Sequence, residues 1–149
     1  MNTTKVRFKK LDKKAQMPTY GTEYAAGADL YACTEGETII FQPGETKMIH
    51  TGISLEIPDG YAGLIYARSG IATKRGLAPA NKVGVVDSDY RGEIMVSLHN
   101  HSNDVQEISD KERIAQLVIA PFLAVEFEET EELTDTERGE GGFGSTGKK

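Results

Sequence analysis

The sequence predicts an all-β fold in a single domain, and three features of its 149 residues support this. Short runs rich in Val, Ile, Tyr and Phe recur along the chain, and most of its 16 Gly and 5 Pro lie between them. No stretch keeps a 3.6-residue apolar period for three turns, as an amphipathic helix would. The length suffices to bury a core without disulfides or metal ions. Many short strands at such spacing are typical of a barrel or a jelly-roll sandwich rather than a parallel α/β sheet.

Nine runs of the chain are predicted as strands. In the clearest, Glu93–Leu98, apolar and polar residues alternate, so we expect Ile94, Val96 and Leu98 to face a core. Turns at 42–45 and 58–60 should keep the connections tight, because Pro presets φ and Gly accepts a positive φ. Ser69–Arg75 is expected to form one short helix. The predicted strands are Val6–Phe8, Thr38–Phe41, Lys47–His50, Ile53–Ile57, Tyr61–Tyr66, Val83–Val86, Glu93–Leu98, Ile114–Ala120 and Ala124–Phe127.

The C-terminal part of the chain has a different composition from the rest. Seven acidic residues and no basic one lie between Glu126 and Glu137, and five of the last twelve residues are Gly. Glycine-rich ends are costly to order and are typical of flexible segments. We therefore expect a β-barrel core over residues 1–130, followed over 131–149 by an acidic linker and a flexible C-terminal arm.

Charge and cysteine content exclude several classes of protein. A net charge of −6 argues against a broad basic face for long nucleic acids, although a few arginines with a divalent cation can still hold one triphosphate. Cys33 is the single cysteine, which rules out an intrachain disulfide and fits a reducing compartment. Met1–Gln16 lacks the apolar block of a signal peptide, and no run approaches the roughly 18 apolar residues of a membrane span. We expect a cytoplasmic protein, or one in a host cytoplasm if it is viral, that binds no membrane.

Two segments in the first half of the chain carry residues suited to a phosphorylated ligand. In Ala26–Ala32, Asp29 is a single carboxylate among small residues, where backbone can approach a ligand; an isolated aspartate more often caps a turn. Ala67–Gly70 follows an apolar strand, so Arg68, the Ser69 hydroxyl and free N–H groups could converge on phosphate oxygens. A buried arginine paired with a carboxylate is the alternative.

Two further segments lie in the second half of the core. In the segment Gly84–Gly92, two β-branched residues are followed by a predicted turn that contains two aspartates, a tyrosine and an arginine. Such a turn could also be a solvated hairpin without function. Lys111–Leu117 places Gln116 among apolar neighbours on a strand, where its amide must find hydrogen-bond partners. Those partners are usually backbone groups, and a ligand is the less common one.

The C-terminal arm contains an incomplete P-loop pattern from Gly142 to Lys148. We reject that interpretation, because Lys149 stands where the motif needs Ser or Thr and no helix can follow. What remains is a strip with one cation, one aromatic ring and two hydroxyls: Arg138, Phe143, Ser145 and Thr146. It could close over a nucleotide, with the ring on the base and the polar groups at the phosphates. A disordered end without a role is the alternative.

The three histidines form no recognisable site. His99 and His101 lie near the end of a predicted strand, and His50 lies elsewhere. This spacing fits neither a zinc site nor a Ser-His-Asp triad, so all three are interpreted as structural or surface residues.

Taken together and in this order, these five segments resemble the five sequence motifs of the trimeric dUTP pyrophosphatases, over about 26–147. The resemblance implies a jelly-roll-like β-barrel subunit and a homotrimer, with an active site at each subunit interface finished by a C-terminal arm. It also implies hydrolysis of dUTP to dUMP and pyrophosphate with Mg²⁺ as cofactor. Whether each arm serves its own subunit or a neighbour is left open.

The resemblance assigns roles to individual residues. Asp87 matches the aspartate that orients the attacking water or acts as its base, and Tyr90 matches the ring packed beneath deoxyribose. Asp29 matches the carboxylate that holds magnesium through water. Residues matching the phosphate contacts are Arg68, Ser69, Gly70, Gln116, Arg138, Ser145 and Thr146, and those matching the uracil contacts are Asn81, Val85, Val86, Met95 and Phe143. Glu140 departs from the family, which commonly has Ser or Thr there, and its carboxylate should avoid the phosphates at the start of the arm.

Two other functions compete with this hypothesis. A dCTP deaminase, or a bifunctional deaminase and dUTPase, has the same fold but matches the segments at 87–90 and 143–147 less well. A nucleotide-gated interaction module, for which hydrolysis is incidental, belongs to a different class. Ammonia release from dCTP would favour the first, and a partner whose binding depends on dUTP would favour the second.

Overall fold

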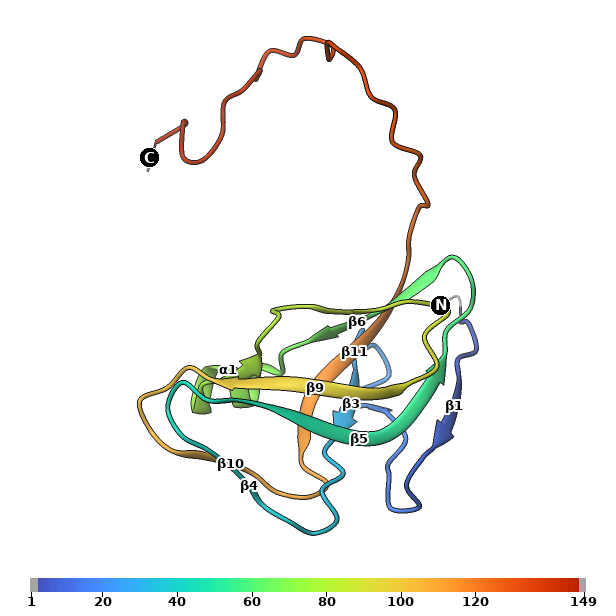
Figure 1. Ribbon diagram of the computed structural model, residues 1–149, viewed down its shortest axis with the longest axis vertical. Helices are drawn as coiled ribbons and strands as arrows, with labels where there is room; N and C mark the ends of the chain where they lie inside the picture. The colour runs from blue at the N-terminus through green and yellow to red at the C-terminus, as the bar shows by residue number, and fades with distance from the viewer. Residues whose placement is uncertain (1–2, 148–149) are drawn as a thin grey trace.

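A computed structural model of the protein describes residues 3–147 and shows a mostly β fold with one short helix (Figure 1). Two larger sheets enclose the core, and a two-stranded sheet of β4 and β10 lies beside them. The arrangement is jelly-roll-like, as expected, with open sheets rather than one closed barrel in this part of the chain. The elements are β1 (Arg7–Lys10), β2 (Thr19–Tyr20), β3 (Ala28–Tyr31), β4 (Ile39–Phe41), β5 (Thr46–Glu56), β6 (Tyr61–Tyr66), α1 (Ser69–Arg75), β7 (Leu77–Pro79), β8 (Gly84–Val86), β9 (Glu93–Asn100), β10 (Gln106–Ile108) and β11 (Arg113–Pro121).

The two larger sheets share strands that are far apart in sequence. One has the order β1-β5-β9-β7 and the other β2-β3-β11-β6-β8, with antiparallel pairing throughout. Alternation places the predicted apolar face of β9 inside, where Ile94, Val96 and Leu98 are each at most 2% exposed. Burial of such side chains contributes about 1.5–3 kcal/mol each. The chain crosses between the two sheets at both ends of β8, and one part of the candidate site lies in this region.

The predicted strands Lys47–His50 and Ile53–Ile57 prove to be one strand, β5. The β5–β9 register shifts between His50 and Ser54, where Gly52 adopts a φ of 69°. This is a β-bulge, in which one strand carries extra residues against its partner. A positive φ favours glycine because it has no Cβ, and a Cβ here would lie 2.9 Å from that of Ala15.

The predicted strand Ala124–Phe127 is wrong for the single chain. After β11 the chain leaves the sheets as an extended arm (Figure 1). Leu123, Val125 and Phe127 are 88, 63 and 93% exposed. A strand needs a neighbouring edge for its backbone groups, and this segment lies away from both sheets. None of the helices in residues 3–147 is long and apolar enough to span a membrane.

Candidate active site

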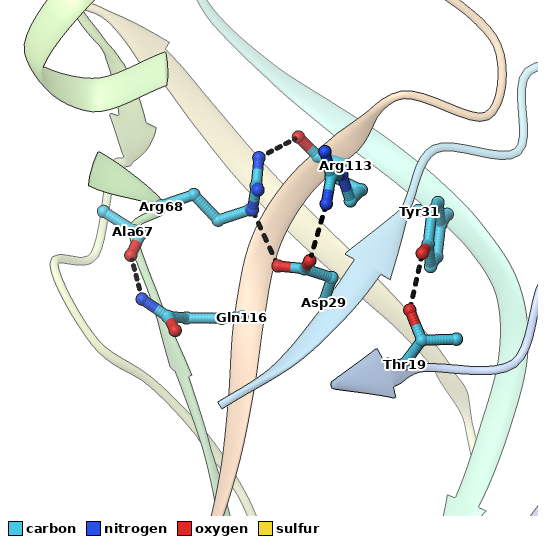
Figure 2. Close-up of polar contacts among 7 residues, drawn as sticks. All are labelled: Thr19, Asp29, Tyr31, Ala67, Arg68, Arg113 and Gln116. Carbon is cyan, nitrogen blue, oxygen red and sulfur yellow. Dashed lines mark hydrogen bonds and ion pairs between the residues drawn. The ribbon is translucent and has the colours of Figure 1, made fainter. Parts of the chain in front are cut away.

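The first part of the site is a cluster of charged and amide side chains around Asp29. This carboxylate accepts hydrogen bonds from two arginines, with 2.7 Å between Oδ1 and Nε of Arg68 and 3.3 Å between Oδ2 and Nη1 of Arg113 (Figure 2). The Asp29 side chain is only 12% exposed, so screening by water is weak. Two guanidinium groups face one carboxylate here, which leaves the cluster with an excess of positive charge.

The sheet register explains why residues so far apart in sequence meet. Gln116 of β11 lies opposite Asp29 of β3 on one side and opposite Tyr66 of β6 on the other. Arg68 follows the end of β6 and reaches back across β11 to Asp29 (Figure 2). Side chains that lie directly opposite each other on neighbouring strands are on the same face of the sheet. Asp29, Gln116 and Tyr66 therefore form one row across the three strands.

Gln116 is held in place by backbone on both sides. Its Nε2 donates to the carbonyl of Ala67 at 2.8 Å, which is the backbone partner expected of a glutamine on a strand (Figure 2). A Cβ on Gly27 would lie 2.4 Å from its Oε1. Gly27 is therefore needed for the close passage of this side chain.

The helix α1 begins beside the cluster. Ser69 and Gly70 are exposed at its first turn, and a Cβ on Gly70 would meet nothing within 4 Å. The other end of α1 is anchored by Arg75, which bonds the carboxylate of Glu112 and the carbonyl of Glu107. The open end of α1 and the Arg68 side chain thus border the same space.

The second part of the site is a pocket of about 240 Å³ at the point where the two sheets meet. Its walls come from β8, the following turn and the start of β9. Six of the residues predicted from the sequence line it, and they are Asn81, Val85, Val86, Asp87, Tyr90 and Met95. Met48, Ile65, Gly84, Glu93 and Ile94 complete the lining.

Strand β8 contributes mainly backbone groups to this pocket, rather than side chains. Within residues 3–147 it pairs only with β6, so its other edge is free there. The Val86 side chain is 8% exposed and belongs to the core, whereas Val85 is 64% exposed on the opposite face. A ligand at this edge would meet peptide N–H and C=O groups.

The turn after β8 presents one carboxylate and one aromatic ring. Asp87 is exposed and its carbonyl accepts the N–H of Tyr90 at 3.2 Å. The Tyr90 side chain folds back, and its hydroxyl donates to the carbonyl of Glu93 at 2.9 Å. An exposed carboxylate beside an apolar pocket can accept a proton from bound water.

The structure does not bring the arm residues to either part of the site. Arg138, Phe143, Ser145 and Thr146 are all exposed, and Phe143 has no covering at all. The hydrogen bonds of Arg138 and Ser145 stay within the arm, to Gly141 and Gly142. Any role of these residues requires movement of the arm or a second copy of the chain.

Arg113 and Glu93 are two members of the site region that sequence reasoning missed. In the sequence, the segment around Arg113 was selected only because of Gln116. Nothing in the sequence reveals that Arg113 lies opposite Tyr31, the residue after Leu30 in β3. Glu93 was noted only as a polar position of an alternating strand. Its contacts depend on the bulge in β5, which leaves no mark in the sequence beyond Gly52.

A larger pocket lies elsewhere and contains none of the predicted site residues. It has a volume of about 510 Å³ and lies beside β1 and β2, with a lining that is mostly apolar and includes Val6, Phe8 and Leu117. Among the described residues that line it, Glu23 alone is charged. The chemistry of the smaller pocket and the Asp29 cluster therefore identifies the candidate site better than size does.

An all-β fold with a pocket of about 240 Å³ at β8 and, as a separate feature, a carboxylate that holds two arginines fits the class of proteins that bind small phosphorylated ligands. The dUTPase family model matches residues 13–147, so this chain belongs to the dUTPase family. It is 54% identical over 144 residues to the deoxyuridine 5'-triphosphate nucleotidohydrolase of Nautilia profundicola, covering 97% of this chain and 99% of the relative. The enzyme of the same name from Syntrophotalea carbinolica is 46% identical over 147 residues, covering 99% of each chain.

Solved structures agree with these relatives. The dUTPase of Staphylococcus bacteriophage 80alpha with dUPNHPP superposes with a TM-score of 0.88 at 32% identity, covering 97% of this chain and 99% of the phage chain. The family and the jelly-roll-like fold expected from the sequence are thereby confirmed.

Proposed function

We propose that this protein hydrolyses dUTP to dUMP and pyrophosphate, which keeps uracil out of DNA and supplies dUMP. The observation that carries the proposal is the pocket at β8. Six residues chosen from the sequence line this one pocket, five of them for contacts with the nucleoside and Asp87 for orienting the attacking water. The names of the relatives and the phage structure with a dUTP analogue support the same substrate.

Selection of uracil is assigned to the free edge of β8 and to Asn81. Uracil carries an acceptor at O4 and a donor at N3, whereas cytosine carries a donor and an acceptor at the corresponding positions. A fixed peptide group that pairs with uracil would be left unpaired by cytosine, and such a mismatch discriminates strongly. Val85, Val86 and Met95 supply the wall against which the base lies.

The chemistry is assigned to Asp87, with Tyr90 as the wall beneath the sugar. Asp87 orients a water molecule for in-line attack on the α-phosphorus and accepts its proton. The bond from the α-phosphorus to the bridging oxygen breaks as the new bond forms, and pyrophosphate leaves. The Tyr90 ring fills the space that a 2′-hydroxyl would need, so a ribonucleotide binds poorly.

Phosphate binding is assigned to Arg68, Ser69, Gly70 and Gln116. The excess positive charge around Asp29 and the open end of α1 support this assignment. Fixed positive groups aimed at the site of developing charge are a large source of transition-state stabilisation. Holding Arg68 on a carboxylate also fixes its side chain before the substrate arrives.

The residues present fit a magnesium ion only through water. Asp29 is the one carboxylate of the cluster, and no group of three potential metal-ligating side chains occurs within residues 3–147. Each Asp29 oxygen accepts one N–H and keeps a further lone pair, which can accept a hydrogen bond from a metal-bound water. Mg²⁺ keeps several waters and favours phosphate oxygens, and when bound it would neutralise charge on the triphosphate.

A homotrimer is proposed as the working form, with the arm completing the site. Exposure of Leu123, Val125 and Phe127 supports this, since apolar residues alternating along an exposed segment are suited to pair with another sheet edge. In the closed state Phe143 stacks on uracil, while Arg138, Ser145 and Thr146 meet the phosphates.

Residues 1–130 act as the core and 131–149 as linker and arm. A cytoplasmic location fits the single buried Cys33.

Hydrolysis in heavy-oxygen water tests the proposed reaction. Attack at the α-phosphorus places the label in dUMP and leaves pyrophosphate unlabelled, as read by mass spectrometry of both products. Label in pyrophosphate, or formation of dUDP and phosphate, would contradict the mechanism. Incubation with dCTP in parallel, with an assay for ammonia, tests the deaminase alternative.

A further inference from the structure

The position of the Tyr90 side chain is determined by contacts with two neighbouring residues, Gly92 and Glu93. Its hydroxyl donates to the carbonyl of Glu93, and a Cβ placed on Gly92 would lie 2.4 Å from that hydroxyl oxygen. The ring therefore lies against bare backbone at Gly92, with its far end fixed on Glu93. The position of this ring depends on where the start of β9 is held.

The turn that carries Tyr90 is bonded mostly to itself. The Tyr90 N–H donates to the carbonyl of Asp87, and the Arg91 guanidinium donates to the carbonyls of Ser88 and Tyr90 at 2.6 and 3.1 Å. These bonds give the turn its shape. The turn is joined to the sheets by the bond from Tyr90 to Glu93 and by a 3.8 Å ion pair between Arg91 and Glu56 of β5. Both side chains of that ion pair are exposed, so the bond to Glu93 is the stronger link.

The Glu93 carboxylate in turn is bound to the bulge of β5. Its Oε1 accepts the N–H of Gly52 at 2.9 Å, and its Oε2 lies 2.8 Å from Nδ1 of His50. The register shift at the bulge takes Gly52 out of the regular ladder, and the carboxylate supplies the missing acceptor. The side chain is 22% exposed, so these bonds form in a partly dehydrated setting.

The bulge is itself immobilised from its other side. The carbonyl of Gly52 accepts the N–H groups of Leu11 and Asp12 at 2.7 and 3.3 Å. Next to it, the Thr51 hydroxyl bonds the carbonyl of Ile94. A continuous chain of hydrogen bonds thus runs from the N-terminal segment through Gly52 and Glu93 to Tyr90.

We propose that Glu93 is a positioning residue that holds the Tyr90 ring in place and so sets the preference of the site for deoxyribose over ribose. This inference rests on the proposed function, because Tyr90 is taken there as the wall beneath the sugar. Glu93 acts through its anchorage in the β5 bulge rather than through contact with the reacting phosphate. Loss of the carboxylate frees the start of β9 and lets the ring move away from the sugar.

The test compares kcat/KM for dUTP and UTP in the full-length protein and three variants. Glu93→Ala should lower the dUTP/UTP ratio by about tenfold, mainly through loss of the good substrate. Glu93→Gln should stay close to the unchanged protein, because its amide oxygen can accept from Gly52 and its NH₂ can donate to the other His50 tautomer. Glu107→Ala, on the exposed face of β10, is the matched control.

A double-mutant cycle separates positioning from general destabilisation. If Glu93 acts through Tyr90, Glu93→Ala should change the ratio no further once Tyr90→Ala is present. Additive effects, or a Glu93→Ala protein with a lower Tm and an unchanged ratio, would overturn the inference. Gly92→Ala approaches from the other side, since its methyl group should displace the ring and lower the ratio with the bulge intact.

Hydrogen exchange provides a readout that does not need activity. Amides of residues 87–92 should exchange about tenfold faster in Glu93→Ala than in Glu107→Ala, because the start of β9, which holds Tyr90, loses its bonds to the β5 bulge. Equal exchange in the two variants would overturn the role of Glu93. Absence of pyrophosphate release from dUTP by the unchanged protein would contradict the proposed function, and the exchange measurement would still decide the role of Glu93.

Discussion

Asp29 of β3 binds Arg68 through Oδ1 at 2.7 Å and Arg113 through Oδ2 at 3.3 Å, so one carboxylate orders two arginines. The proposed magnesium ion must share this carboxylate through water. Asp29 therefore has two roles in the account, as an anchor for the guanidinium groups and as an acceptor for a metal-bound water.

Replacing Asp29 should damage both roles. Asp29→Ala leaves two guanidinium groups without their shared counter-charge, and we expect kcat/KM for dUTP to fall by about 10²–10³-fold. The magnesium concentration for half-maximal activity should also rise. Arg113→Gln should have a smaller effect, because Arg68 keeps its bond to Asp29. Activity of Asp29→Ala within about twofold of the unchanged protein would show that neither role matters.

Asp87→Asn tests the proposed base. The amide keeps the size of the carboxylate but cannot accept the proton of water, so kcat should fall by about 10²–10⁴-fold. Binding of a non-hydrolysable dUTP analogue, followed by calorimetry, should change little. Asp89→Asn in the same turn is the matched control and should retain its activity. Near-normal turnover by Asp87→Asn would remove this residue from the mechanism.

Asp110 should contribute stability that depends on pH. The backbone N–H of Thr34, at 2.8 Å, holds the pKa of the Asp110 carboxyl below its ordinary value of 3.8. The unfolded chain then binds this proton at higher pH than the folded chain does. The stabilisation is complete above the unfolded pKa and is lost as pH falls through the lower folded pKa.

The corresponding measurement is thermal unfolding of Asp110→Asn and the unchanged protein across this pH range. The variant should have the lower Tm at neutral pH, and the difference should shrink below about pH 4. Asp59→Asn, in an exposed turn, controls for the loss of one negative charge. A difference in Tm that is the same at every pH would contradict a contribution from ionised Asp110.

Deleting residues 138–149 tests the arm. Because residues 138–147 lie away from the sheets, folding and assembly should be unchanged by circular dichroism and light scattering. Activity should fall by about 10²-fold or more, since closure over the triphosphate orients it and excludes water. Phe143→Ala should cause part of this loss, because stacking on a base is worth about 1–3 kcal/mol. An arm-deleted protein with full activity would contradict a catalytic role for the arm.

Subunit exchange between two inactive proteins tests whether the site is shared between chains. Mixing the arm-deleted protein with Asp87→Asn should restore some activity if Asp87 and the arm come from different chains. Mass spectrometry of the mixture verifies that exchange has occurred. Verified exchange without recovered activity would mean that each arm serves its own chain.

Local pattern was enough to predict several elements. The strand Tyr61–Tyr66 and the helix Ser69–Arg75 have the predicted bounds, and the apolar face of β9 is buried as alternation required. Strand β3 was missed because Asp29 interrupts its apolar run. Burial of this carboxylate is compensated by hydrogen bonds from two arginines in distant segments. Strand β7 was missed because Pro79 argues against a strand, although it is tolerated at a sheet edge.

The contacts that could not be predicted from the sequence are those that depend on the register between distant strands. The grouping of Asn81, Asp87, Tyr90 and Met95 in one pocket follows from a turn and a strand close in sequence, so it was predictable. The pairing of Arg113 with Asp29 joins residues 84 apart and depends on the β3–β11 register. The contact of Glu93 with Gly52 depends on a bulge in another strand. Neither contact could be predicted from local periodicity.

The central claim is that the site accepts uracil on deoxyribose as a triphosphate, and pyrophosphate release across a nucleotide panel tests it most directly. With Mg²⁺ present, we predict rapid release from dUTP, with kcat/KM for dCTP, dTTP and UTP lower by about 10²-fold or more and loss of activity in excess EDTA. Comparable release from dUTP and dCTP, or from dUTP and UTP, would contradict the account.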